Sequence, residues 1–581
     1  MIKGGQTQMI RTITFLAIFL ITGVAFSQKK KKEKIATEEI NVVKPFSPTV
    51  SEAFKINLEP EIDSIELWPK KDVSYSINSI PVASTFTPAK GKAKTLKRVP
   101  NERFYNNFIS AGFGNYGTPI VEIFAHGSSS RYNDMGGFLN YHASGGGVDG
   151  VLLDDDFMNL DIDLFYKQSE RTFDWKATGG ISRLSNNWYG LSDKIDYSET
   201  TLSSIAEKQS YTNLYLQGEI KFFDALIHTG DISFNRFSDK FDSKENHLEL
   251  NTVIDFPIGQ ELMYSEISLE FLNGRFENNF FQTDNLSYTY FNLGFSPNFE
   301  ILRDNLTVNA GARLYYSITN DFDGSKFYIY PNITASYNIS EEALIAYAGV
   351  VGDLEQNSYK NFVEINPFVS PTLFIQRTNQ QYNAYAGIKG LLNSKVRFNL
   401  KAAYISEKDK PLFKLNPSLT DGTNEVTQGY EAANSFQVIY DDVNTIHFNG
   451  EIIFDLFKEF KFGGNIEFNS YSLNSEEHAW NLPLIRSALL AKYTKKKWSA
   501  GADLFFSSDR KDELSVIPSS RSIITNGAFF DINLNGVYHI NDKFDVFVNF
   551  NNILNTNYQV YTNFRVQGFQ FFAGLKYKFD F

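Results

Sequence analysis

The C-terminal end of the chain alternates between apolar and mostly polar side chains. Counting back from Phe581, every second residue is apolar: Phe579, Tyr577, Leu575, Ala573, Phe571 and Phe569. The other register reads Asp580, Lys578, Lys576, Gly574, Phe572 and Gln570. Such alternation predicts a β-strand with one apolar face and one mostly polar face. Because this strand runs to the last residue and ends on an aromatic side chain, lipid is a better solvent for it than water.

The same alternation recurs from Phe104 onward in aromatic-rich runs of roughly ten to fifteen residues, as a tilted membrane strand requires. Clear examples are the runs 160–167, 213–221, 396–402 and 460–469. A charge on a lipid-facing position costs about 2–4 kcal/mol at the bilayer midplane. The charged members of these runs are therefore expected to point into a barrel lumen: Asp161, Asp163, Glu219, Lys401 and Glu467.

Connections between the runs alternate in length. Tight turns such as 458–459 and 495–497 alternate with long loops, which are expected near 145–156, 185–207, 319–325, 353–375, 408–433, 508–524 and 552–565. If 434–457 is one long strand, the chain is all-β and forms a transmembrane antiparallel β-barrel of about twenty-two strands. The turns would be periplasmic and the loops extracellular. A helical membrane protein is excluded, because no apolar run of about eighteen residues exists.

The first hundred residues differ from the rest. The apolar run 13–26 follows Lys3 and Arg11 and is followed by Ser27, which predicts a signal peptide over residues 1–27. Residues 28–103 carry scattered prolines and broken periodicity, so we expect an extended, partly disordered periplasmic segment. Residues 104–581 form the predicted barrel, integral to the bacterial outer membrane and in contact with its lipid. The chain has no cysteine, which removes disulfides and a lipoprotein anchor.

Little in the sequence suggests chemistry. A net charge of −12 argues against a nucleic-acid partner. The seven histidines show no His-x-x-x-His spacing, so we expect no metal site, no cofactor and no catalytic residues, and hence no enzyme. The acidic run 154–156 is either a cation-binding loop or a solvated one. Aromatic residues of the long loops either stack on a ligand or pack the loops together: Trp188, Tyr189, Tyr197, Phe362, Phe368, Phe374, Phe413 and Tyr430.

The region from Asp531 to Phe579 resembles the C-terminal end of TonB-dependent outer-membrane receptors. Its most specific part is Asn551-Asn552-Ile553-Leu554-Asn555 followed by Tyr558. The resemblance implies a twenty-two-stranded barrel and energised uptake of a nutrient, and the aromatic-rich, Asn-rich style is similar to barrels of Bacteroidota. Separately, the alternation that ends on Phe581 resembles the closing strand of bacterial outer-membrane barrels. That resemblance implies that the barrel-assembly machinery reads this strand at Phe581, Phe579 and Tyr577.

The chain departs from that family ahead of the barrel. The family carries a globular plug domain there, whereas segment 28–103 is too short and too poor in periodicity to form one. Within this segment, one stretch resembles the TonB box, which adds a strand to the energy-coupling protein: Glu39, Ile40, Asn41, Val42 and Val43.

Two functions follow from these observations. The first is binding or translocation of a solute across the outer membrane, with TonB or a periplasmic or lipoprotein partner. The alternative is a non-transport barrel subunit of a larger outer-membrane complex, such as secretion, gliding or barrel-assembly machinery, that acts as a docking scaffold. The missing plug favours the alternative, whereas the resemblance favours the first.

Overall fold

The structure is a computed structural model that describes residues 105–581, apart from 260, 283, 321–323, 341–342 and 518–519. The predicted signal peptide, the predicted periplasmic segment and the residues Glu39 to Val43 lie outside the described residues, and these assignments stay predictions. Among the described residues, no helix is both long and apolar enough to cross a membrane.

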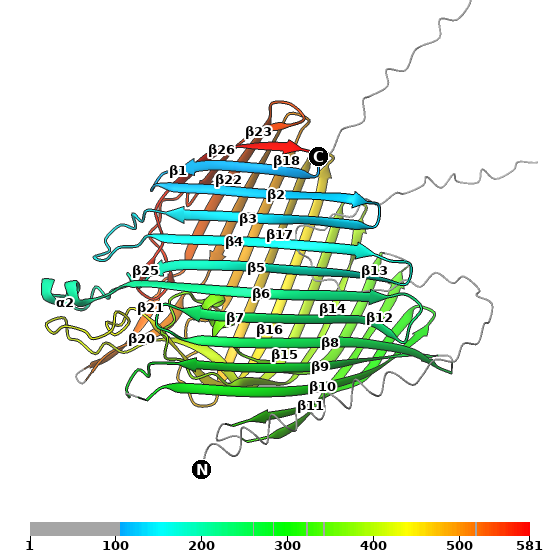
Figure 1. Cartoon of the computed structure of the whole chain (residues 1–581), viewed down its shortest axis with the longest axis horizontal. Helices are drawn as coiled ribbons and strands as arrows, with labels where there is room; N and C mark the ends of the chain where they lie inside the picture. Colours follow the sequence, from blue (N-terminus) through cyan, green and yellow to red (C-terminus); the bar gives the residue numbers. More distant parts are fainter. Residues whose placement is uncertain (1–104, 260, 283, 321–323, 341–342, 518–519) are drawn as a thin grey trace, which may run out of the picture. The chain divides into compact units, whose positions relative to one another are not determined.

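Twenty-two strands form one antiparallel sheet, which closes into a barrel because β1 pairs with β26 (Figure 1). The wall strands are β1 (Asn107–Gly114), β2 (Thr118–Ser130), β3 (Asn133–Ser144), β4 (Phe157–Ser169), β5 (Phe173–Asn187), β6 (Lys208–Phe222), β7 (Ile227–Asp239), β8 (Lys244–Ile258), β9 (Glu261–Phe276), β10 (Leu286–Arg303), β11 (Leu306–Thr319), β12 (Lys326–Ser340), β13 (Leu344–Gln356), β14 (Arg377–Asn393), β15 (Val396–Leu415), β16 (Phe436–Phe457), β17 (Phe460–Leu473), β18 (Ile485–Thr494), β19 (Trp498–Ser507), β22 (Phe529–His539), β23 (Phe544–Asn551) and β26 (Gln570–Phe579). The predicted all-β, twenty-two-stranded antiparallel barrel is therefore confirmed.

The long connections all lie at one end of the barrel, which we call the loop end, and the other end, which we call the turn end, has only short connections. The loop end carries the remaining elements: α2 (Glu199–Ser204), α3 (Tyr359–Ile365), the hairpin of β20 (Arg510–Val516) and β21 (Ser520–Asn526), and the hairpin of β24 (Gln559–Tyr561) and β25 (Phe564–Arg565). In Figure 1, α2, β20, β21 and β25 lie on the left, away from the C-terminus. The connections 277–285 and 474–484 also lie at this end, and the sequence prediction did not name them.

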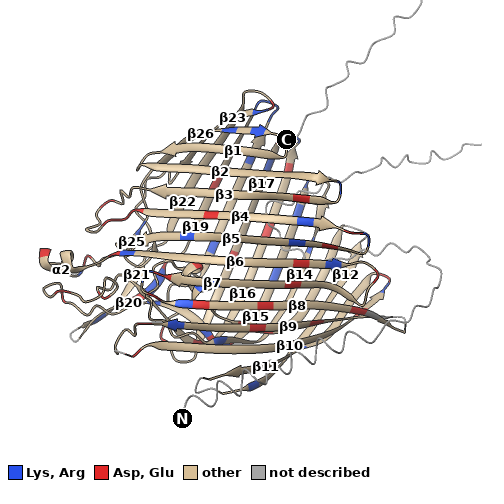
Figure 2. Cartoon of the chain, in the orientation of Figure 1, with Lys and Arg blue, Asp and Glu red and all other residues tan. Residues whose placement is uncertain are grey.

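Each wall strand sorts its side chains onto two faces, because neighbouring residues of a strand point in opposite directions. One face carries large apolar side chains that stay exposed, such as Leu164, Leu216, Leu400, Ile466 and Leu575. The other face carries most of the charged and amide side chains, and Figure 2 shows charged residues along the wall strands as well as in the loops. This sorting is what a barrel wall between hydrocarbon and an aqueous lumen requires.

Candidate functional site: the capped mouth and the polar wall of the barrel

The connections at the loop end fold over one another and share a single hydrophobic cluster, which we call the cap core. Its fully buried members include Trp188, Tyr211, Leu272, Phe276, Tyr290, Tyr359, Phe362, Leu373, Tyr430, Phe436 and Phe564. These residues come from four different loops and from wall strands as far apart as β6 and β16. Strands on distant parts of the wall can meet in one cluster only across the interior, so the cap core spans the interior of the barrel at the loop end.

Aromatic rings join the loops to one another. Trp188 lies with its ring centroid 5.6 Å from that of Phe241 and 5.5 Å from that of Tyr430, which links the connections 188–207, 240–243 and 416–435. Phe368 stacks on Phe564 at 3.7 Å, which joins the loop after α3 to the β24–β25 hairpin. Buried aromatic pairs of this kind are worth about 0.5–1.5 kcal/mol beyond the area that they bury.

The helix α3 is fixed at its N-terminus by a buried carboxylate of the wall. Glu245 on β8 is 1% exposed and accepts hydrogen bonds from the backbone N–H groups of Tyr359 (2.7 Å) and Lys360 (3.1 Å). It also accepts one from the Tyr288 hydroxyl at 2.6 Å. A carboxylate at a helix N-terminus satisfies unpaired donors and complements the helix dipole. Ser358 completes the cap by accepting from Asn361 N–H at 3.1 Å.

A second set of hydrogen bonds ties the α2 loop to the connection 416–435. The carbonyl of Gly422 accepts from the Ser198 N–H (2.8 Å) and from the Thr201 hydroxyl (2.7 Å). Farther along, the Tyr197 hydroxyl donates to the Ala432 carbonyl at 3.1 Å. Because the same pair of loops also shares the cap core, they form one packed body rather than two separate loops.

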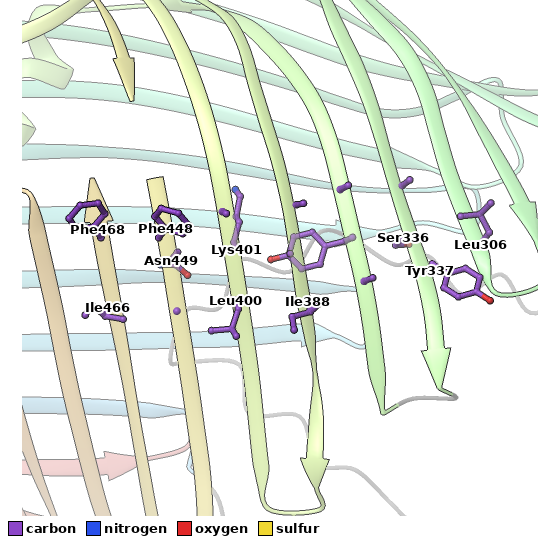
Figure 3. Close-up of a pocket in the computed structure, with 18 residues that line it drawn as sticks. Leu306, Ser336, Tyr337, Ile388, Leu400, Lys401, Phe448, Asn449, Ile466 and Phe468 are labelled. Carbon is purple, nitrogen blue, oxygen red and sulfur yellow. The ribbon is translucent and has the colours of Figure 1, made fainter. Parts of the chain in front are cut away.

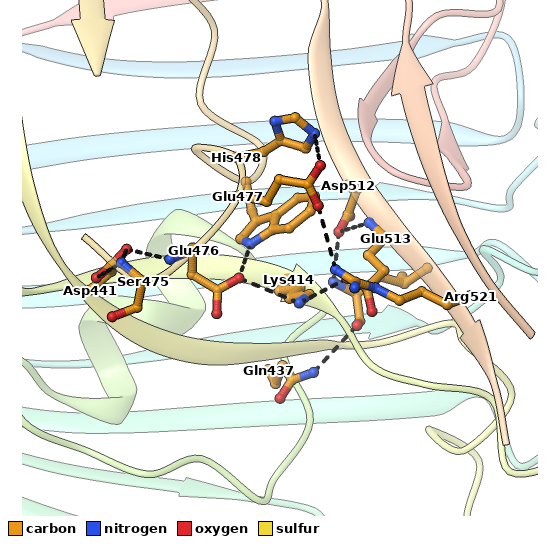
Figure 4. A network of polar contacts seen from close by, with 12 residues as sticks. Lys414, Gln437, Asp441, Ser475, Glu476, Glu477, His478, Asp512, Glu513 and Arg521 are labelled. Atoms are coloured by element: carbon orange, nitrogen blue, oxygen red, sulfur yellow. Dashed lines mark hydrogen bonds and ion pairs between the residues drawn. The ribbon is translucent and has the colours of Figure 1, made fainter. Parts of the chain in front are cut away.

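Charged residues organise the base of the β20–β21 hairpin (Figure 4). Glu513 pairs with Lys414 (3.1 Å) and with Arg521 (2.8 Å). Burial raises the pKa of Glu513, but these two cations outweigh it and hold the pKa below its usual range. The stabilisation from this carboxylate is therefore present above the pKa of an unfolded glutamate, and it is lost as the pH falls through the lower pKa of the folded state.

The neighbouring carboxylate of Asp512 is fully buried and joins four segments. It accepts from the N–H of Leu415 (3.0 Å), the side-chain amide of Asn481 (2.8 Å), the hydroxyl of Thr562 (2.6 Å) and the N–H of Glu513 (2.8 Å). Burial raises the pKa of Asp512 above its usual value. The hydrogen bonds favour the charged form and offset only part of this rise. Without this acceptor, the N–H groups of Leu415 and Glu513 and the Asn481 amide would each lose a partner, and the Thr562 hydroxyl would have only the Asn481 oxygen, 3.4 Å away, to donate to.

We expect Asp512→Asn to loosen the β20–β21 hairpin without unfolding the barrel. The asparagine side chain keeps one oxygen acceptor, but its NH₂ group faces the four groups that donate to Asp512. Each lost hydrogen bond to a charged group costs about 1.5–3 kcal/mol. Hydrogen exchange of residues 508–528 measures the effect, with faster exchange there and unchanged exchange in β4. Asp509→Asn is the matched control because Asp509 is exposed. Equal protection of the hairpin in both variants would contradict the role given to Asp512.

The structure decides between the two interpretations of the loop aromatics. Trp188, Phe362 and Tyr430 lie inside the cap core, and Tyr189, Phe368 and Phe413 pack against it. Phe374 stays 49% exposed. With Tyr197 bonded to Ala432 as described, the set mainly packs the loops together.

The acidic run 154–156 is used inside its own loop. Asp155 accepts from the N–H groups of Gly147 (3.0 Å) and Val148 (2.8 Å). Asp156 accepts from the Asn187 amide at 2.7 Å and pairs with Lys208 at 3.2 Å. These contacts shape the loop between β3 and β4 and join it to β5 and β6.

Two of the predicted lumen residues lie on β4. Asp163 accepts a hydrogen bond from the hydroxyl of Tyr215 on β6, which reaches across β5. Gly180 of β5 lies between the two side chains and leaves room for this contact. A Cβ at Gly180 would come within 2.6 Å of both side chains. Strand pairing continues this row from Tyr215 to Asn235 and His247, next to the α3-anchoring Glu245. Asp161, two residues before Asp163 on the same face, lies 3.4 Å from the Asn140 amide.

The other three predicted lumen residues lie on β6, β15 and β17. Glu219 lies 3.6 Å from the Lys176 ammonium. The Lys401 ammonium lies 4.5 Å from the ring centroid of Tyr385, a cation–π contact. Glu467 is paired across strands with Asn449 and Arg486. The five predicted residues are spread around the wall and do not converge on one site.

The opposite face of the wall carries an apolar groove of about 990 Å³ over β11 to β17 (Figure 3). Small side chains form its floor, among them Ala346, Ala348, Ala386, Ala402 and Gly450. Larger side chains border it: Tyr337, Ile388, Leu400, Phe448, Ile466 and Phe468. Ser336, Lys401 and Asn449 also border the groove, but its exposed lining is mostly apolar, which suits contact with hydrocarbon better than recognition of a polar solute.

Sequence reasoning missed one cluster. Within the described residues, a single group of side chains has the composition and spacing to hold a metal ion: His247, Glu249 and Glu270. The spacing His-x-x-x-His places two ligands on one face of a helix, so a search for it cannot find a cluster that is built on strands. In a strand, residues two apart share a face, so His247-Leu248-Glu249 was the available signal.

At the C-terminus, Tyr577 and Phe579 stack at 5.7 Å, and Phe581 is 89% exposed. The proposed reading of these residues by assembly machinery stays a prediction.

The chain matches no protein-family model and no curated protein. Solved outer-membrane receptors share its fold. The pyoverdine outer membrane receptor FpvA of Pseudomonas aeruginosa, bound to pyoverdine, gives a TM-score of 0.60 at 13% identity over 82% of this chain and 78% of that one. A mutant of the ferric enterobactin receptor PfeA of the same organism, in complex with enterobactin, gives 0.59 at 12% identity, covering 81% of each chain. The ferric-catecholate import receptor Fiu of E. coli gives 0.57 at 10% identity, also over 81% of each.

Proposed function

We propose that this chain is an outer-membrane receptor barrel that binds a solute at its extracellular mouth and passes it through the lumen. The observation that carries the proposal is the cap core, in which four loops pack on one another across the mouth of a wide barrel. A barrel of this width leaves an aqueous hole unless something occupies it, so a transporter and a scaffold both need the mouth covered. A cover built from loops can also open to admit a solute. The fold shared with solved receptors supports the same function.

The mechanism that we propose is gated passage. The loop end faces the outside of the cell, and the solute displaces cap contacts to enter a lumen lined by charged and amide side chains. Asp161, Asp163, Glu219, Lys401 and Glu467 are the lining residues that we propose. We propose TonB as the energy source. Two resemblances support this proposal: that of the C-terminal region to TonB-dependent receptors and that of the segment from Glu39 to Val43 to the TonB box.

A disulfide across the cap tests the gate. Ser418, in the loop between β15 and β16, bridges Val516 at the end of β20, and backbone hydrogen bonds of 2.7 and 3.0 Å hold the two segments together. Bridged residues lie within the Cα separation of about 4.4–6.8 Å that a disulfide needs. The chain has no native cysteine to compete. We expect Ser418→Cys/Val516→Cys to block uptake when oxidised and to recover it when reduced.

The measurement is growth of a strain that carries only the double variant. The nutrient is whichever of limiting iron, cobalamin or glycans the deletion strain cannot use. The single variant Ser418→Cys is the control and should grow as the parent does under both redox conditions. If the deletion strain grows as the parent on all three nutrients and the purified barrel recovers stable partner proteins, the scaffold function replaces the proposed one.

A further inference from the structure

Three side chains of the polar wall bring their ligand atoms to one point. His247 and Glu249 lie two residues apart on β8, and Glu249 pairs directly with Glu270 on β9, so all three share a face. The Nε2 atom of His247 lies 2.8 Å from Oε1 of Glu270 and 3.3 Å from Oε1 of Glu249. The three ligand atoms all lie within 4.8 Å of one another. His247 itself is 7% exposed.

This arrangement is incomplete as a purely protein contact. A single Nε2 carries at most one proton, so it donates one good hydrogen bond, while two carboxylate oxygens approach it. Two carboxylates directly opposite each other on neighbouring strands also repel. In the described part of the chain, no Lys or Arg pairs with either Glu249 or Glu270. A divalent cation at the common point would satisfy all three groups together.

The outer oxygens of both carboxylates are held by further hydrogen bonds. The Ser233 hydroxyl donates to Oε2 of Glu249 at 3.1 Å, and the Asn292 amide donates to Oε2 of Glu270 at 2.9 Å. Each glutamate therefore keeps Oε1 turned toward His247. Such outer contacts are the usual means by which proteins orient metal ligands.

We propose that His247, Glu249 and Glu270 form a binding site for a divalent first-row transition-metal ion. One imidazole and two carboxylates suit Zn²⁺ and its neighbours, whereas Mg²⁺ and Ca²⁺ prefer oxygen ligands alone. Two ligands roughly 2.0–2.1 Å from a tetrahedral Zn²⁺ lie about 3.3 Å apart. The His247–Glu249 separation equals this distance, and the His247–Glu270 separation of 2.8 Å must widen when the ion enters. Three protein ligands leave one position open. The site does not depend on whether the barrel transports a solute.

Zn²⁺ binding to the full-length barrel in detergent tests the site. The protein is purified without a polyhistidine tag, and calorimetry with Zn²⁺ is expected to give one saturable site per chain. His247→Gln, Glu249→Gln and Glu270→Gln should each weaken binding more than about tenfold, and Ser233→Ala should weaken it less, through the orientation of Glu249. Co²⁺ absorption in the visible region is expected to report the same site and to disappear in the His247→Gln variant.

Two matched variants separate this site from other groups. Glu266→Gln removes an exposed carboxylate that lies four residues before Glu270, on the same face of the strand. His126→Gln removes a histidine that pairs with only one carboxylate, that of Asp134 at 2.9 Å. Both should bind Zn²⁺ as the parent protein does. Heat-modifiable mobility on gels checks that every variant is a folded barrel. The proposal is overturned if the parent shows no saturable site, or if the three ligand variants bind as the controls do.

Discussion

Trp188→Ala is expected to open the mouth of the barrel and raise its ion conductance. The Trp188 side chain is fully buried in the cap core, and its ring contacts Phe241 and Tyr430 from two other connections. Truncating a buried Trp costs about 3–5 kcal/mol. The wall strands are held by a closed ladder of hydrogen bonds that the substitution does not touch, so the loss falls on the cap. The loops should therefore separate while the barrel stays folded.

Planar-bilayer recording measures this effect. The parent barrel is expected to show little conductance, and the variant should show frequent or permanent open states. Phe374→Ala is the control, because this loop aromatic is half exposed and its loss leaves the cap core intact. If the two variants conduct equally, the cap core does not close the pore, and the gating proposal loses its basis.

Glu245→Ala is expected to release α3 from the wall. The substitution leaves the N–H groups of Tyr359 and Lys360 and the Tyr288 hydroxyl without their acceptor. Each buried donor left unsatisfied costs about 1–3 kcal/mol, and the helix also loses the charge that complements its dipole. The total is several kcal/mol concentrated on a short helix, which has little propensity of its own to persist.

Limited proteolysis of the connection 357–376 measures this release, together with hydrogen exchange of the α3 amides. Both should increase strongly in Glu245→Ala and partly in Glu245→Gln, which keeps one oxygen acceptor. Glu364→Gln is the matched control, since Glu364 lies on α3 itself but is exposed and pairs only with Lys360. Protection of α3 that is the same in Glu245→Ala and in the control would show that cap packing alone holds the helix.

The two predictions separate the cap from the wall. The wall is a continuous ladder in which every strand has two neighbours, so it tolerates the loss of single side chains. The cap depends on a few aromatic residues and on single acceptors such as Glu245 and Asp512. Elements held by few contacts open at lower free energy than the rest of a structure. The gated passage proposed above requires that difference.

The sequence by itself determined the wall. Alternation with period two is a local property, so it places Leu164 and Asp163 on opposite faces whichever strands become neighbours. Turns such as 458–459 and 495–497 are likewise local, and both were predicted where the structure has them. The long strand β16 was predicted over 434–457 and observed over Phe436–Phe457.

Only the tertiary structure decided the cap and the metal cluster. Whether Trp188 meets a ligand or Tyr430 depends on which loops approach each other across the mouth, and no local pattern contains that information. Likewise, Glu270 reaches His247 only because the register between β8 and β9 places Glu270 directly opposite Glu249. Strand pairing brings together residues that are distant in sequence, and a shift of one residue would turn each side chain to the other face. The local pattern therefore predicts the faces of the barrel, while register and loop packing decide what meets inside it.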